Sequence, residues 1–94
     1  MSGDRVPERS SSTAWQIIDD ELVLLRVKDK ELLGLNDVGR RIWELSDGTR
    51  SIDQIVETVT MEFEVPREVA KADTSRFIEE LATIRALEFR AHPR

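Results

Sequence analysis

Residues 35–55 predict two consecutive helices joined by a tight turn, and this pattern limits the fold more than any other segment. Asn36 is a favoured N-cap residue for the first helix. Apolar residues recur around it at helical spacing, at Leu35, Val38, Ile42 and Leu45. Asp47-Gly48 ends this helix, because glycine tolerates the left-handed conformation common at helix ends. Ser51 and Gln54 then form a capping box that begins the second helix.

Size and composition restrict the function. A chain of 94 residues makes one small domain, with little room for both a core and a deep catalytic cleft. The net charge of −5 argues against nucleic acid, which proteins usually bind through a basic face. The absence of cysteine excludes disulfides, thiolate nucleophiles and cysteine-ligated zinc or iron. No apolar run reaches membrane-spanning length and no signal peptide is recognisable, so we expect a cytoplasmic protein with no membrane partner.

The order of elements predicts an α+β fold, a three-stranded antiparallel sheet followed by three helices. Short apolar runs separated by charged turns predict strands over 14–18, 21–27 and 31–35. Helical periodicity predicts helices over about 37–47, 52–63 and 66–85. The last two helices resemble a helix-turn-helix pair. The expected organisation is a disordered N-terminal tail over 1–13, a folded domain over 14–89 and a frayed C-terminal tail over 90–94.

Several apolar residues are expected to build the core. The third helix presents an apolar stripe of Val69, Ala70, Phe77, Leu81 and Ile84. Trp43 belongs to the first helix and is expected in the core, where Gly39 makes room for close packing. Trp15 is expected to be half exposed, where a partner could contact it.

Nothing in the sequence predicts an active site. His92 is the single histidine, and it lies in the expected C-terminal tail. A catalytic triad or metal site needs several ligands that converge on ordered elements. Asp19-Asp20 and Glu79-Glu80 are adjacent pairs that suit a solvated surface, and the four glycines form no phosphate-binding cluster. We therefore expect no enzyme activity, no metal and no cofactor.

The segment from Leu32 to Val56 resembles the PqqD-like family, the peptide-recognition domains of pathways that modify ribosomally made peptides. The likeness covers roughly residues 20–88 and rests on Leu35-Asn36, Gly39, Ile42-Trp43, Asp47-Gly48-Thr49, Ile55, Phe77, Leu81 and Leu87. Two positions depart from the family pattern. Ala86 replaces a common glycine before the final apolar residue, and Leu32-Leu33 replaces a usual aromatic.

The resemblance implies a winged helix-turn-helix-like domain that binds the leader segment of a precursor peptide. The leader would add as a strand to the third strand, in a groove shared with the third helix. It would then be presented to a modifying enzyme, such as a radical-SAM enzyme, a protease or a cyclodehydratase. The expected peptide-binding residues are Lys30, Glu31, Leu32, Leu33, Gly34, Asp73, Arg76 and Phe77. An edge strand suits this role because its free N–H and C=O groups pair with an extended peptide.

Two other functions stay open at this stage. A scaffold that binds a folded partner enzyme is the first, and a DNA-binding winged helix is the weaker second. The second helix has no basic residue, and basic and acidic residues balance over 66–85. That balance disfavours DNA. Leu33 and Phe77 could equally be core residues with no role in binding.

Overall fold

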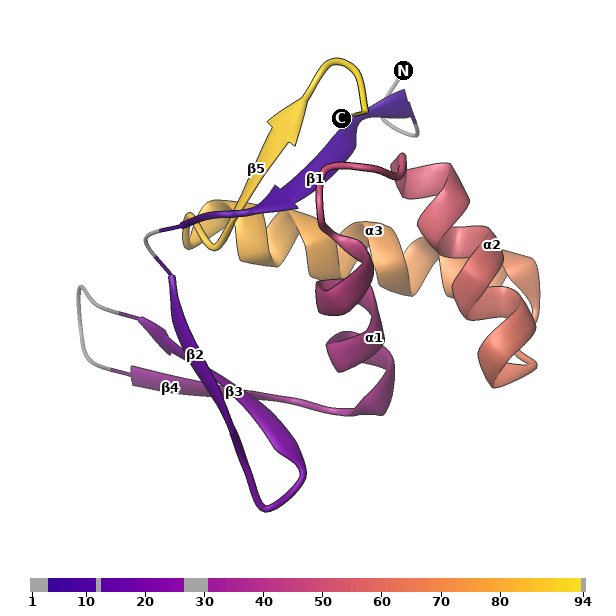
Figure 1. Cartoon of the computed structure of the whole chain (residues 1–94). Coiled ribbons are helices and arrows are strands. Elements are labelled where there is room, and N and C mark those ends of the chain that lie inside the picture. The colour runs from indigo at the N-terminus through magenta and orange to yellow at the C-terminus, as the bar shows by residue number, and fades with distance from the viewer. Residues whose placement is uncertain (1–3, 12, 27–30, 94) are drawn as a thin grey trace.

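A computed structural model describes residues 4–11, 13–26 and 31–93, with the backbone alone for 26 and 31–33. Its elements follow the chain as β1 (Val6–Arg9), β2 (Ala14–Ile18), β3 (Glu21–Arg26), β4 (Glu31–Leu35), α1 (Asp37–Leu45), α2 (Ile52–Phe63), α3 (Arg67–Thr83) and β5 (Leu87–Arg90). The predicted α+β class is confirmed. Figure 1 shows the three-stranded sheet on one side of α1, with α2 on the other and the β1–β5 ribbon above.

The three-stranded sheet is the antiparallel meander that the sequence predicts, in the order β2-β3-β4. Asp19 and Asp20 connect β2 to β3, both with positive φ, as a two-residue hairpin turn of type I′ requires. Side chains alternate between the faces, so Leu22, Leu24 and Leu35 lie buried on the inner face. Both β2 and β4 are edge strands of this sheet.

The caps of α1 and α2 confirm the prediction from residues 35–55. The Asn36 side chain accepts a hydrogen bond from the Gly39 N–H at 2.8 Å. Ser51 and Gln54 make both hydrogen bonds of the capping box. Gly48 is buried in the turn with φ 82°, the left-handed conformation expected there. Trp43 is 2% exposed and joins the core with Ile42 and Leu45.

The face that helix α3 turns to the core is only partly the one predicted. Its buried residues are Ala70, Thr74, Ile78 and Leu81. Val69 is 49% exposed, so its assignment to the apolar stripe was wrong. Phe77 is half-buried at the margin of the core. The periodic pattern misplaced the stripe because buried Thr74 is polar, whereas exposed Val69 is apolar.

The predicted disordered tail is wrong for Val6–Arg9, which form β1 and pair antiparallel with β5. Val6 is 1% exposed, and Pro7 is among the fully buried side chains. The frayed C-terminal tail is likewise wrong for Arg90, which ends β5 and pairs with Glu8 at 3.3 Å. The folded unit therefore begins before residue 14 and ends after residue 89. Two short segments become strands because they meet each other, which no local pattern reveals.

Strand β1 also joins the loop between α1 and α2. The Arg9 N–H donates to the Ser46 carbonyl, and the Gly48 N–H donates to the Pro7 carbonyl. The Arg9 guanidinium donates to the carbonyls of Trp43 and Glu44, both at 2.9 Å. These carbonyls lie in the last turn of α1, where a helix lacks internal donors. Arg9 therefore caps α1 from a distant part of the chain.

The end of α3 carries a strained residue and yields a prediction. Arg85 has φ 63°, while the Ala86 N–H donates to the Leu81 carbonyl in a Schellman-type ending. A side chain in this conformation costs roughly 1 kcal/mol, whereas glycine adopts it freely. We expect Arg85→Gly to raise the free energy of unfolding by about 1 kcal/mol in urea denaturation. Lys71→Gly, at an exposed site inside α3, should lower it by a similar amount. Destabilisation by both changes would contradict this account of the helix end.

The contribution of Asp47, in the turn after α1, to the stability of the fold depends on pH. Burial opposes ionisation of this carboxylate, but hydrogen bonds from Thr49 and the charge of Arg50 outweigh it, so the pKa of Asp47 lies below its usual value. A carboxyl group with a lowered pKa stabilises the folded state above its unfolded pKa of about 3.9, and this contribution is lost as pH falls through the folded value. Asp47→Ala should therefore destabilise the protein at pH 7 and much less near pH 3. Urea denaturation at both pH values measures this, and an equal loss at both would contradict it.

Candidate functional site

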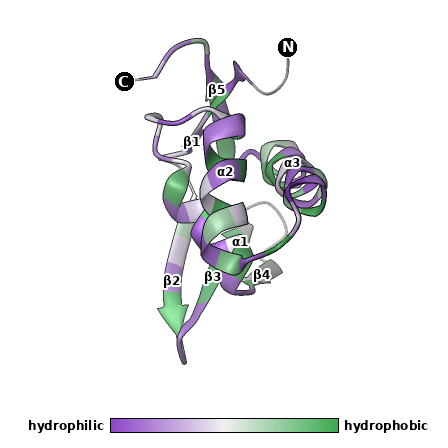
Figure 2. Ribbon diagram, turned by 90° about the vertical axis from the view of Figure 1, so that its right-hand side faces the viewer, coloured by the Kyte–Doolittle hydropathy of each residue, from purple (hydrophilic) through white to green (hydrophobic). Residues whose placement is uncertain are grey.

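A groove lies between the start of α1 and the face of α3, beside the end of β4. Its volume is about 270 Å³, and its lining residues are Gly34, Asn36, Val38, Gly39, Ile42, Asp73, Arg76 and Phe77. They come from three elements that meet at this place. Figure 2 shows α3 and β4 on the same side of the molecule, with β2 on the opposite side.

Gly39 and Phe77 determine the shape of this groove. A Cβ atom on Gly39 would lie 3.1 Å from Phe77 Cζ and 3.3 Å from Asn36 Oδ1, which is tighter than ordinary contact. The missing side chain therefore lets Phe77 lie against the first turn of α1. Because Phe77 is only half-buried, part of its ring remains available at the groove. The floor is apolar and receives Ile42 and Val38 from α1.

Charged side chains lie at one margin of the groove. Arg76 pairs with Asp73 one turn earlier on α3 at 3.4 Å, and both side chains are more than half exposed. An ion pair this exposed adds little to stability. Asp73 and Arg76 can therefore each pair with a charge on a bound molecule instead, at a small cost in free energy.

The structure places the predicted site residues as follows. Gly34, Asp73, Arg76 and Phe77 all line the groove. Glu31, Leu32 and Leu33 lie in β4, at the edge of the sheet. Lys30 lies outside the described residues. The two segments expected to act together, although about 40 positions apart in sequence, do meet.

Four residues of the groove were not predicted as site residues: Asn36, Val38, Gly39 and Ile42. Their sequence patterns indicate scaffold roles, a helix cap for Asn36 and packing for the other three. Gly39 carried a usable signal, because a glycine inside an amphipathic helix indicates that another element approaches closely. That element is α3, and the approach forms the groove.

The edge of β4 and the groove together fit an extended peptide. A strand at the edge of a sheet offers main-chain donors and acceptors to a new strand. Pockets beside such an edge receive alternate side chains of the added strand. Within residues 4–11, 13–26 and 31–93, no group of three or more histidine or acidic side chains could hold a metal ion. Over those same ranges, none of the helices combines the length and apolar character needed to cross a membrane.

Comparisons with known proteins agree with this geometry. The family model for coenzyme PQQ synthesis protein D (PqqD) matches residues 21–87. This chain is 33% identical to TbiB1, and it superposes with a TM-score of 0.73 on the structure described as TbiB1 in complex with the TbiA(beta) leader peptide. The match covers 86% of this chain and 94% of the TbiB1 chain. The PqqD truncation of Methylobacterium extorquens PqqCD, a stand-alone RiPP recognition element solved by NMR, is 21% identical. The match covers 94% of this chain and 93% of the PqqD truncation, with a TM-score of 0.72. No curated protein sequence gives a significant match. Because the family model spans well over half of its length, this chain belongs to the PqqD family.

Proposed function

We propose that this protein binds the leader segment of a ribosomally made precursor peptide without catalysing a reaction itself. The observation that carries the proposal is the groove that joins the β4 edge to α3. TbiB1, a structure similar over most of both chains, is solved with a leader peptide. The leader adds as a strand along Lys30–Gly34, with Asp73, Arg76 and Phe77 contacting its side chains.

The bound leader is presented to a modifying enzyme, which we propose to be a radical-SAM enzyme, a protease or a cyclodehydratase. Main-chain hydrogen bonds hold the leader without reading its sequence, and the groove supplies the selectivity. An added strand of this length suits a micromolar to sub-micromolar complex, worth about 8–10 kcal/mol. Such an affinity lets the leader dissociate after the modification. A cytoplasmic location remains a prediction.

Titration of the ¹⁵N-labelled chain tests the proposal. The probes are leader peptides from small precursor genes adjacent to the gene for this protein. We expect chemical shift changes over 31–39 and along the Asp73–Phe77 face of α3. A matched peptide with proline at alternate positions should bind far more weakly, because proline removes strand donors. Binding only to an intact enzyme, with no response to any adjacent leader, would refute leader recognition.

DNA binding receives no support from the recognition helix of the helix-turn-helix-like pair. Helix α3 carries three basic and four acidic residues in its sequence REVAKADTSRFIEELAT. Arg67 is paired with Glu57 at 2.7 Å, and Arg76 is paired with Asp73. A helix of this charge would be repelled by phosphates.

A further inference from the structure

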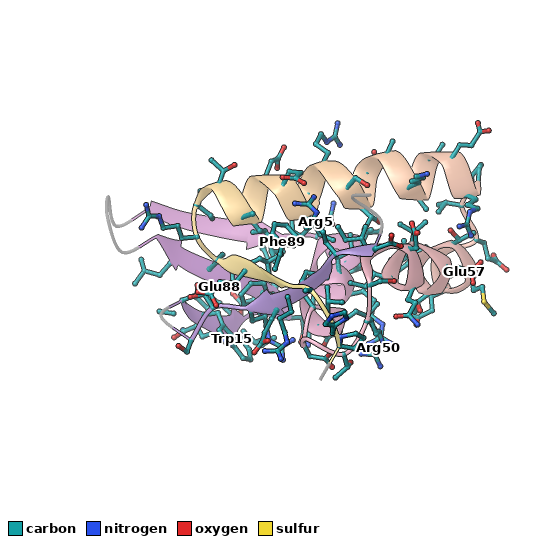
Figure 3. All side chains as sticks on the ribbon, turned by 90° about the horizontal axis from the view of Figure 1, so that it is seen from above. Arg5, Trp15, Arg50, Glu57, Glu88 and Phe89 are labelled. Carbon is teal, nitrogen blue, oxygen red and sulfur yellow. The ribbon has the colours of Figure 1, made fainter. Side chains whose placement is uncertain are left out.

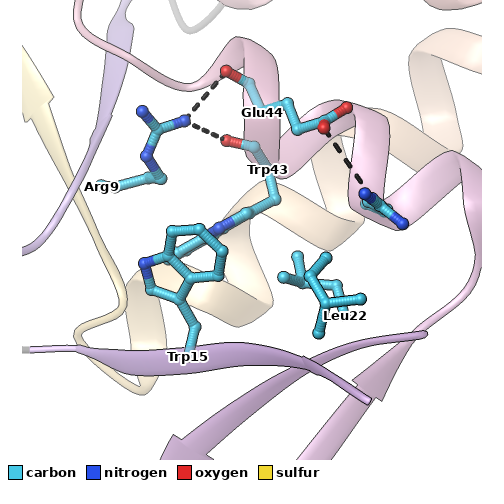
Figure 4. A pocket seen from close by; sticks show the side chains of 7 residues that line it. Arg9, Trp15, Leu22, Trp43 and Glu44 are labelled. Atoms are coloured by element: carbon cyan, nitrogen blue, oxygen red, sulfur yellow. Dashed lines mark hydrogen bonds and ion pairs between the residues drawn. The ribbon is translucent and has the colours of Figure 1, made fainter. Parts of the chain in front are cut away.

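A second groove lies at the opposite edge of the sheet from β4, between β2 and α1. Its volume is about 440 Å³, larger than that of the groove beside β4. The lining residues, together called the Trp15 groove, are Arg9, Trp15, Ile17, Leu22, Arg40, Trp43 and Glu44. Figure 3 shows Trp15 at the side of the molecule away from α3. Figure 4 shows the Trp15 ring at the mouth of this groove, in front of the Trp43 side chain.

Strand β2 borders the Trp15 groove and is an unusually apolar edge strand. Its sequence AWQII has no charged residue, and all five residues are exposed. Trp15 is 53% exposed and Ile17 is 43% exposed, although both share the sheet face on which Leu22 and Leu24 are buried. Native edge strands usually carry charges or proline that prevent pairing with other chains. This edge lacks those protections, which is expected where another chain covers it.

Trp43 provides an independent indication of a missing partner. Its side chain is a wall of the Trp15 groove, and the residue is 2% exposed. The indole Nε1 has no hydrogen-bond acceptor within the described part of the chain. A buried donor without an acceptor costs about 1–3 kcal/mol. An occupant that displaces the exposed Trp15 ring would bring an acceptor to this nitrogen and remove that cost.

The charges of the Trp15 groove favour an acidic occupant. Arg9 donates to two neutral carbonyls, which leave its positive charge unbalanced. Arg40 reaches the carbonyl of Asp20 at 3.3 Å and the carboxylate of Glu44 only at 3.8 Å. One carboxylate therefore faces two guanidinium groups across an otherwise apolar groove.

We propose that the Trp15 groove and the β2 edge bind an extended segment of a partner protein that turns two apolar side chains and one acidic side chain toward the groove from alternate positions. The segment pairs with β2, inserts apolar side chains beside Trp15 and Ile17, and places a carboxylate near Arg40 and Trp43 Nε1. A second copy of this chain fits less well, because β2 pairing with β2 brings no carboxylate to the guanidinium groups. The domain then holds two extended chains at opposite edges of one sheet, the leader at β4 and the partner segment at β2.

A synthetic peptide tests this inference directly. The probe is the acetylated, amidated heptapeptide Gly-Ile-Thr-Glu-Thr-Ile-Gly, which as a strand turns both isoleucines and the glutamate to one face. The matched control has lysine for glutamate. The chain has two tryptophans, so its ¹⁵N spectrum has two indole N–H signals, which Trp15→Phe assigns. We expect the acidic peptide to move both signals, that of Trp43 downfield as its N–H gains an acceptor. The lysine peptide should bind at least about tenfold more weakly.

Variants and alternative outcomes make the test decisive. Ile17→Lys should abolish the response, and Arg40→Gln should weaken binding about tenfold. Met61→Lys, at a 79% exposed site on α2 outside both grooves, should leave it unchanged. Equal binding of both peptides would overturn the inference. Shifts confined to Gly34 and Gly39, in the groove beside β4, would overturn it as well. Indole shifts that follow protein concentration without peptide would identify a second copy as the occupant and also overturn it.

Discussion

Val6→Asp should lower the free energy of unfolding by about 4 kcal/mol, most of the stability of a domain this small. Val6 is 1% exposed in β1, and an aspartate there would place an unpaired charge in the core. The same strand supports the α1–α2 loop and brings Arg9 to the end of α1. Urea denaturation followed by circular dichroism measures the loss. Deletion of residues 1–9 should be at least as damaging.

Val69→Asp is the matched control for this experiment. Val69 is 49% exposed in the first turn of α3, where a negative charge is favourable to the helix dipole. Its free energy of unfolding should change by less than about 0.5 kcal/mol. The opposite pattern, with tolerant Val6 and sensitive Val69, would support the disordered tail and apolar stripe predicted from sequence.

Phe77→Ala should weaken leader binding about 30-fold, equivalent to about 2 kcal/mol. Phe77 is the large aromatic residue of the groove beside β4, and aromatic residues at the centre of an interface contribute most of its binding energy. Calorimetric titration of the leader peptide measures the change. The stability of the variant also falls, because Phe77 packs against the core.

Phe63→Ala separates the loss of binding from the loss of stability. Phe63 ends α2, is half-buried against the same core and does not line the groove. It should destabilise the domain by an amount similar to Phe77→Ala but leave leader affinity within about twofold. An equal loss of affinity in both variants would mean that destabilisation, and not contact with Phe77, weakens binding.

Local patterns predicted most elements because each is encoded within a few residues. The capping box of Ser51 and Gln54 and the cap of Asn36 formed as expected, since both depend on side chains three positions from the bonds they satisfy. Asp19-Asp20 marked the hairpin turn for the same reason. The strands failed where pairing is long-range: β1 and β5 are about 80 residues apart and gain their hydrogen bonds only from each other.

The candidate site was predicted in part. Resemblance to the PqqD-like family brought Gly34, Asp73, Arg76 and Phe77 together before the structure did. The role of Gly39 was partly visible, because its close packing was expected but its neighbour was unknown. The Trp15 groove was not predicted, since Arg9 was assigned to a tail and Trp43 to the core.

The sequence by itself determined the local elements of this protein, the caps of α1 and α2 and the strand meander, because hydrogen bonds between near neighbours depend on nearby residue types. Tertiary structure alone decided that residues 6–9 join the fold, that Val69 faces solvent, and that two grooves lie at opposite edges of one sheet. These outcomes depend on which surfaces meet, and burial between distant segments leaves no periodic trace in either segment.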